Sequence, residues 1–135
     1  MNNGNDGSLW RWMAAAVLAH LVTSMVHGTA HQGAHIPLSQ AATLFVFVVI
    51  LAGPVVGLAL TWRAERTGSF IVALTMAGSL VFGLVNHFLL NSPDHISRVE
   101  EQWRIIFGTT AALLTITEML GMGVAIRLIR VRRSP

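Results

Sequence analysis

A stripe of polar side chains runs along the first apolar stretch of the chain. His20, Ser24, His27 and His31 are spaced i, i+4, i+7 and i+11, and His35 follows four residues later. On a helix the first four fall within roughly 60° of one another. Imidazoles are rare in apolar stretches that can cross a bilayer, and they need polar partners there. The spacing therefore predicts a polar site inside a helical bundle.

A second group of metal-binding residue types follows the third apolar stretch. His87 lies near the end of that stretch, and Asp94 and His95 lie in the turn after it. Two histidines one turn apart on a helix, joined by histidine and aspartate from another element, form a ligand set for zinc, copper or iron. Helical bundles build metal sites from side chains of facing helices. The sequence thus predicts a transition-metal site with these ligands: His27, His31, His87, Asp94 and His95.

A deeper polar pair is expected nearer the middle of the membrane. Glu118 is the only carboxylate deep within an apolar stretch, and Glu118 and His20 each lie nine residues from an arginine at the end of their stretch. Nine residues of helix rise roughly 14 Å, so the two side chains have matching depth. An isolated carboxylate is costly there, which favours a His20–Glu118 pair. The alternative is a neutral Glu118 bonded to a backbone carbonyl or to a neighbouring hydroxyl, that of Thr115 or Thr117.

The composition is that of a membrane protein in one domain. Of 135 residues, 53% are hydrophobic and only 11% are charged, so a lipid bilayer is the expected partner. The chain has no cysteine, which excludes disulfides, thiolate metal sites and iron–sulfur clusters. All nine basic residues are arginine. They form no basic stripe with interleaved aromatic residues, so nucleic-acid binding is not expected.

The apolar stretches predict an all-α, up-down four-helix bundle in the membrane, because helices joined by short turns are antiparallel neighbours. Pro54 should kink the second helix, and the pattern Ser97-Arg-Val-Glu100 is typical of a capping box that starts the fourth helix near Arg98. The expected membrane domain covers residues 9–128, between a disordered polar tail at 1–8 and a basic tail at 129–135. Its expected spans are 9–30, 38–62, 69–91 and 98–127.

The arginines predict the orientation of the bundle, because cytoplasmic segments of membrane proteins are rich in basic residues. One face has Arg98 and Arg104 alone. The opposite face has Arg11, Arg63, Arg66, Arg127, Arg130, Arg132 and Arg133. Both termini are therefore expected in the cytoplasm, with loops 31–37 and 92–97 outside an inner or plasma membrane.

Several functions fit these residues. The first is metal handling or a metal-dependent oxidoreductase at the outer face. The second is electron transfer by b-type haem, with two of the outer histidines as axial ligands. The third is a proton or ion relay that uses His20 and Glu118, in a homo-oligomer or a larger complex. The fourth is a non-catalytic accessory subunit whose polar residues fix the helix register.

Overall fold

The computed structural model describes residues 3–131, which form helices joined by turns and contain no strand. The segments η1 and η2 are π-helical and η3 is a single 3₁₀ turn. Residues 40–60 and residues 65–89 therefore each form one continuous helical rod, in which an α-helix changes to a π-helix along its length. In chain order the elements are α1 (Asn3–Gly33), α2 (Gln40–Phe45), η1 (Val46–Ala52), α3 (Gly53–Leu60), α4 (Glu65–Leu84), η2 (Val85–Leu89), η3 (Ile96–Arg98) and α5 (Glu101–Val131).

Four helical rods in the described part of the chain are long and apolar enough to cross a membrane, and the predicted all-helical class is confirmed. Each has at least the ~20 residues that a hydrocarbon core requires. The first rod, which carries the histidine stripe, is the least apolar of the four. The rods are Gly7–Gly33, Gln40–Leu60, Glu65–Leu89 and Glu101–Val131.

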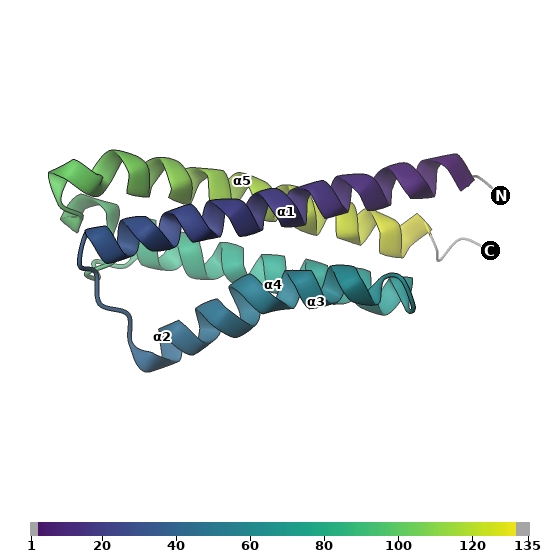
Figure 1. The fold of residues 1–135 in the computed structure, drawn as a ribbon, viewed down its shortest axis with the longest axis horizontal. Coiled ribbons are helices and arrows are strands. Elements are labelled where there is room, and N and C mark those ends of the chain that lie inside the picture. The colour runs from purple at the N-terminus through teal and green to yellow at the C-terminus, as the bar shows by residue number, and fades with distance from the viewer. Residues whose placement is uncertain (1–2, 132–135) are drawn as a thin grey trace.

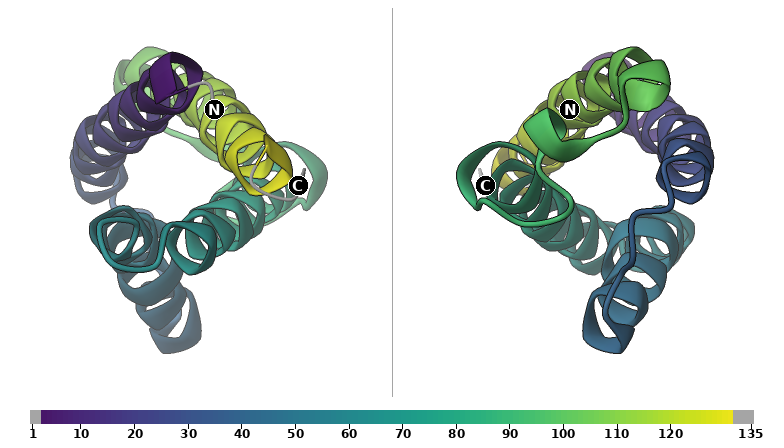
Figure 2. Two further views of the ribbon diagram at one scale, coloured as in Figure 1. Left: turned by 90° about the vertical axis from the view of Figure 1, so that its right-hand side faces the viewer. Right: turned by 90° about the vertical axis from the view of Figure 1, so that its left-hand side faces the viewer.

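The helix α5 is the central packing partner of the fold. α1 packs along α5, α4 packs on another side of it, and α3 packs on α4. The start of α1 and the end of α5 lie at the same end of the molecule (Figure 1). At the other end, α2 leans away from the remaining helices, as the two end views show (Figure 2). This lean leaves α1 and α2 apart where the outer histidines lie.

A π-helical segment accommodates the proline of the second rod. Pro54 has no N–H to donate, and the seven residues of η1 precede the Gly53–Pro54 step directly. The amide of Gly53 bonds the carbonyl of Val48, five residues earlier, and such wide turns are a common cause of helix kinks. The wide π-helical turn before Pro54 therefore accommodates the bend predicted at that residue. The bend directs α2 outward.

Two small apolar clusters close the two ends of the bundle, and polar side chains fill the layer between them. One cluster joins α1, α4 and α5 near the chain termini, and its largest members are Met13, Met76 and Leu128. The other surrounds Phe107 near the start of α5. Against Phe107 and between the two clusters lie these buried polar residues: His20, His27, His31, Ser79, His87, Asp94, Thr110 and Glu118. Hydrogen bonding therefore organises the middle of the bundle.

Helix ends differ from the sequence prediction at two places. Residues 3–8 belong to α1 rather than to a disordered tail, since extending an existing helix avoids the cost of nucleating one. The predicted capping box is wrong: Ser97 bonds the ring of His95, Val99 is extended, and α5 begins at Glu101. The last helix continues to Val131, and residues 132–135 of the predicted basic tail, with residues 1 and 2 of the N-terminal tail, lie outside the described residues.

Candidate metal centre

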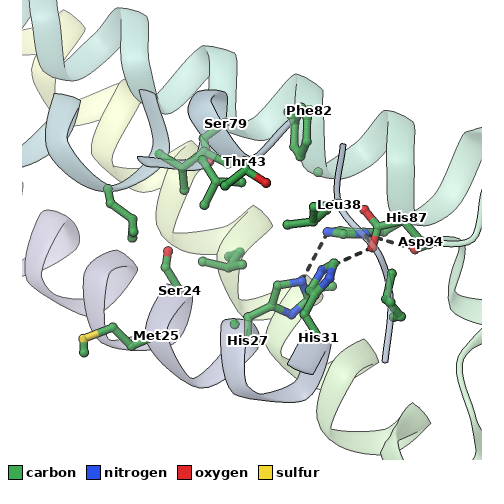
Figure 3. Close-up of a pocket in the computed structure, with 18 of the residues that line it drawn as sticks. Ser24, Met25, His27, His31, Leu38, Thr43, Ser79, Phe82, His87 and Asp94 are labelled. Carbon is green, nitrogen blue, oxygen red and sulfur yellow. Dashed lines mark hydrogen bonds and ion pairs between the residues drawn. The ribbon is translucent and has the colours of Figure 1, made fainter. Parts of the chain in front are cut away.

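Three buried histidines converge between α1 and the end of the third rod. His27 and His31 project from one face of α1, and His87 meets them from η2 (Figure 3). One side-chain nitrogen from each residue lies within 4.8 Å of those of the other two. All three are less than 10% exposed. The arrangement has the composition and the compactness of a site that can hold a metal ion.

A local departure from α-helical geometry positions His87. Asn86 donates its side-chain N–H to the carbonyl of Phe82 at 2.8 Å, the acceptor that its own backbone amide would use in an α-helix. The chain continues as the π-helical turn η2, and the amide of Leu90 bonds the carbonyl of Val85 at 2.7 Å. Single π-turns of this kind are frequent at functional sites. Here the wider turn brings His87 toward α1.

The hydrogen bonds of His27 determine which of its nitrogens carries the proton. Its Nδ1 lies 2.8 Å from the hydroxyl oxygen of Thr110. That hydroxyl donates its own hydrogen to the carbonyl of Ile106 at 2.7 Å, so it accepts from His27. In the neutral ring Nδ1 therefore carries the hydrogen, and Nε2 is left with a free lone pair.

The same reasoning applies to His87. Its Nδ1 lies 3.2 Å from the backbone carbonyl of Asp94, which can only accept a hydrogen bond. The Nε2 of the neutral ring thus carries a lone pair, and it lies 3.3 Å from Nε2 of His27. With both rings neutral, two lone pairs face each other at close range. A cation held between them would turn this repulsion into attraction.

Asp94 lies next to the three histidines, and its carboxylate contacts the rings of His31 and His87. Its Oδ1 lies 3.1 Å from Nε2 of His31 and 3.4 Å from Nδ1 of His87. Burial would raise the pKa of Asp94, but the nearby His87 N–H and the neighbouring imidazoles outweigh that effect, so the pKa lies below its ordinary value. Oδ1 of Asp94 and Nδ1 of His31 are both buried and without a hydrogen-bond partner among the described residues, so the 3.1 Å approach of His31 lacks hydrogen-bond geometry.

The structure brings four of the five predicted ligands together and places the fifth elsewhere. His95 is half-buried in the turn before α5, where its Nδ1 pairs with Ser97 at 2.8 Å. Asp94 lies beside the three clustered histidines rather than within the compact group of nitrogens. His35, the last histidine of the stripe, is exposed beyond the end of α1.

Two residues of α5 complete the cluster and were not identified from the sequence. The ring of Phe107 packs against all three imidazoles, with centroid separations of 4.6 to 5.0 Å, and Thr110 orients His27. Hydroxyls in apolar helices usually bond the carbonyl of their own previous turn, as Thr115 does. The sequence therefore carries no signal that separates Thr110 from such residues.

The deeper polar pair is also in contact. Nδ1 of His20 lies 3.7 Å from Oε1 of Glu118, and Nε2 of the same ring lies 3.0 Å from the carbonyl of Ile50. Glu118 accepts a hydrogen bond from Ser79, a residue that the sequence did not single out. The alternative partners Thr115 and Thr117 bond backbone carbonyls of their own helix instead.

One cavity of about 520 Å³ connects the two polar groups. The histidine cluster lies at one end, and Ser79 and Glu118 lie at the other. Between them the wall is mainly apolar and includes Ile50 as well as Phe82, which Figure 3 shows.

Comparison of the chain with protein-family models, curated proteins and solved structures found no match.

Proposed function

We propose that this chain is an integral membrane protein that binds a transition-metal ion through His27, His31 and His87. The observation that carries the proposal is the 3.3 Å separation of Nε2 of His27 and Nε2 of His87, two rings whose other nitrogens face oxygen atoms. Two nitrogens bound about 2.05 Å from a tetrahedral ion lie about 3.3 Å from each other. The third ring supplies a buried nitrogen that has no partner among the described residues, Nδ1 of His31.

The residues around the cluster support this assignment. A histidine that binds a metal nearly always donates its other ring N–H to a carboxylate or a carbonyl, which fixes the orientation of the ring. Thr110 and Asp94 offer the corresponding acceptors to the three rings. In this proposal Asp94 orients His31 and His87 instead of binding the ion, and His95 has no part in the site.

We further propose that the ion is reactive rather than structural. Three protein ligands leave one position of a tetrahedral ion open, as in catalytic zinc sites, whereas structural sites use four. The histidine cluster forms one end of the cavity, so an open position there faces a space where a small molecule fits. Imidazole ligands suit zinc, copper and iron. Such an ion would supply a Lewis acid or a redox partner for oxidoreductase chemistry or metal handling.

The topology that we propose is an up-down bundle with both termini in the cytoplasm of an inner or plasma membrane. Arg98 and Arg104 lie at the end of the molecule that holds the histidine cluster, while the more arginine-rich end holds the turn before α4. Basic residues favour the cytoplasmic side. Loops 31–37 and 92–97 would then face outward, with the metal centre close to that surface.

Haem is a weaker candidate for this site. Axial nitrogens on the two sides of a haem iron lie about 4 Å apart, at about 2 Å from the metal, with the porphyrin plane between them. The separation of 3.3 Å between Nε2 of His27 and Nε2 of His87 is too short for that geometry. The rings also contact each other edge to face, with centroids 5.0 Å apart.

A proton relay is a second candidate, favoured by the contacts of His20. Nε2 of His20 faces a carbonyl and must carry a hydrogen, so Nδ1 is the only nitrogen that can exchange one with Glu118. Ionisable residues at this depth often mark proton pathways. The relay and the metal centre share one cavity and are compatible with each other.

Elemental analysis of the purified protein, with an absorption spectrum of the same sample, tests the proposal. We expect about one zinc, copper or iron ion per chain, the stoichiometry of a mononuclear site, and no Soret band. A Soret band with matching iron would replace the ion with haem. A metal-free and colourless protein that also fails to bind added zinc, copper or iron would refute the metal centre and leave the relay or an accessory role.

A further inference from the structure

The cavity beside the histidine cluster opens sideways, between α1 and the bent second rod. Met25 of α1 and Phe47 of η1 both line it and are 66% and 62% exposed. Both residues lie inside membrane-spanning rods, so in a bilayer this opening faces lipid chains. Figure 3 shows Met25 directed away from the histidines, toward the outside of the bundle. A ligand that uses this opening arrives from the membrane and must be soluble in lipid.

The two ends of the cavity require two polar groups on that ligand. At one end lie the histidine cluster and the proposed ion, and at the other lie Glu118 and Ser79. A lipid with a single head group would satisfy one end and leave methylene groups against the other. Ser79 already bonds Oε1 of Glu118, whereas Oε2 has no hydrogen-bond partner among the described residues, and a buried polar atom left against methylene groups is costly. The occupant therefore carries an oxygen at each end of a short apolar body.

The separation of the two polar ends indicates the size of that body. His20 does not line the cavity but marks the depth of its partner Glu118: it lies seven residues before His27 on α1, which is roughly 10 Å along a helix. Contacts of about 2 to 3 Å at each end leave roughly 5 Å between the two ligand oxygens. Oxygens at opposite edges of one six-membered ring have this spacing. The cavity volume of about 520 Å³ also admits a substituted ring.

We infer that the cavity binds a membrane-soluble para-quinone or its quinol. One oxygen lies at the metal centre and the other at the Glu118–Ser79 end, while the apolar tail leaves through the opening between α1 and α2. A carboxyl group can accept from a quinol hydroxyl when ionised and donate to a quinone carbonyl when protonated, so Glu118 suits both forms. The inference rests on the proposed metal centre, because that centre is one of its two contacts.

Gly28 provides a substitution that blocks the cavity without altering the ligands. It is an exposed residue of α1 that lines the cavity, and a Cβ added there meets no described atom within 4 Å. The matched control is Gly123 on α5, which is also exposed and equally open but does not line the cavity. A leucine side chain at position 28 fills the opening, whereas one at position 123 projects into lipid.

The experiment titrates decylubiquinone into the protein in phosphatidylcholine nanodiscs, by calorimetry, with metal content measured on each sample. We expect saturable binding to the wild type and to Gly123→Leu, and an affinity at least tenfold lower in Gly28→Leu with unchanged metal content. Glu118→Gln should weaken binding as well, while decanoic acid, which has the tail length but no ring, should not compete.

Other results contradict the inference in distinguishable ways. If the metal-loaded wild type shows no saturable binding, or if Gly28→Leu binds as the wild type does, the quinone site is wrong and the metal centre stands. Competition by decanoic acid would likewise overturn it in favour of a lipid with one head group. If the protein binds the quinone yet cannot be loaded with metal, both the metal centre and the assigned contact fail.

Discussion

The three clustered imidazoles differ from ordinary buried histidines in what their second nitrogens contact. His27 is held by a threonine hydroxyl, and His31 and His87 by the carboxylate or the carbonyl of Asp94. These contacts leave Nε2 of His27 and Nε2 of His87 facing each other, 3.3 Å apart. A network that served packing alone would gain from pairing donors with acceptors, whereas here two acceptors meet.

Alanine at any one of the three positions should therefore remove the metal and leave the fold intact. His27→Ala, His31→Ala and His87→Ala are each expected to reduce the content from about one ion per chain to a trace, at an unchanged helical circular dichroism spectrum. His95→Ala is the matched control, because that ring pairs with Ser97 and should keep its full metal content. Metal that survives all three single substitutions would show that the ligand set is wrong.

Asp94→Asn tests the orienting role of the carboxylate. The amide keeps the size of the side chain but removes the negative charge next to His31 and His87. Loss of such a supporting contact typically weakens metal binding roughly 10- to 100-fold, and we expect a decrease in that range by competition with a chelator. Glu101→Gln, an exposed residue at the same end of the molecule, should bind as the wild type does. Equal affinities for both variants would contradict the role of Asp94.

The lowered pKa of Asp94 makes a separate prediction for stability in acid. Because its folded-state pKa lies below the ordinary value of 3.8, its stabilising contribution is present above pH 3.8 and is lost as the pH falls through the folded-state pKa. In chelator-treated protein, the difference in unfolding temperature between the wild type and Asp94→Asn should shrink as the pH falls from about 5 to below about 4. A difference that grows in acid would give the opposite sign and refute the assignment.

At the scale of helical elements, the wide turns η1 and η2 place the site, and the sequence predicted neither. Pro54 indicated a kink, but not that a π-helical segment before it would carry the bend. The side chain of Asn86 bonds the Phe82 carbonyl at the π-turn that brings His87 into the cluster. Helical spacing alone put His20, His27 and His31 on one face of α1, because α1 is regular throughout.

Close packing of α3 on α4 depends on glycine at position 57. A Cβ there would lie 2.9 Å from both the side chain and the backbone nitrogen of Val72, and a backbone atom cannot rotate away. Gly57→Ala should therefore destabilise the protein by about 1 to 3 kcal/mol, measured by unfolding in mixed detergent micelles. Gly123→Ala, where a Cβ meets no described atom within 4 Å, is the control and should be neutral or slightly stabilising. Equal stabilities would show that the two rods do not need this contact.

For the whole molecule, the proposed orientation can be tested with single cysteines, because the chain has none of its own. His35→Cys lies in the loop after α1 and Thr67→Cys near the start of α4, and both positions are exposed. A membrane-impermeant maleimide should label His35→Cys in intact cells. It should label Thr67→Cys only after permeabilisation. The reverse pattern would place the histidine cluster on the cytoplasmic side.

The sequence predicted the class of the fold and most of the cluster, because both follow from apolar length and helical spacing. Counting residues from the arginines at the helix ends also predicted that His20 and Glu118 lie at the same depth. In the structure Nδ1 of His20 lies 3.7 Å from Oε1 of Glu118. The sequence did not predict the roles of Ser79, Thr110 and Phe107. Those depend on which faces of α4 and α5 meet α1, and rotation about a helix axis is set by packing in three dimensions.

The low apolarity of the first rod has a consequence for biogenesis. α1 comes first in the chain, and its polar stripe finds partners on every later rod: Ile50 on the second, His87 on the third, and Thr110 and Glu118 on α5. During synthesis the imidazoles of α1 would therefore gain their partners one rod at a time. The α5 partners Thr110 and Glu118 come last, so we expect a chain truncated before α5 to retain α1 in the membrane less well than the full chain does.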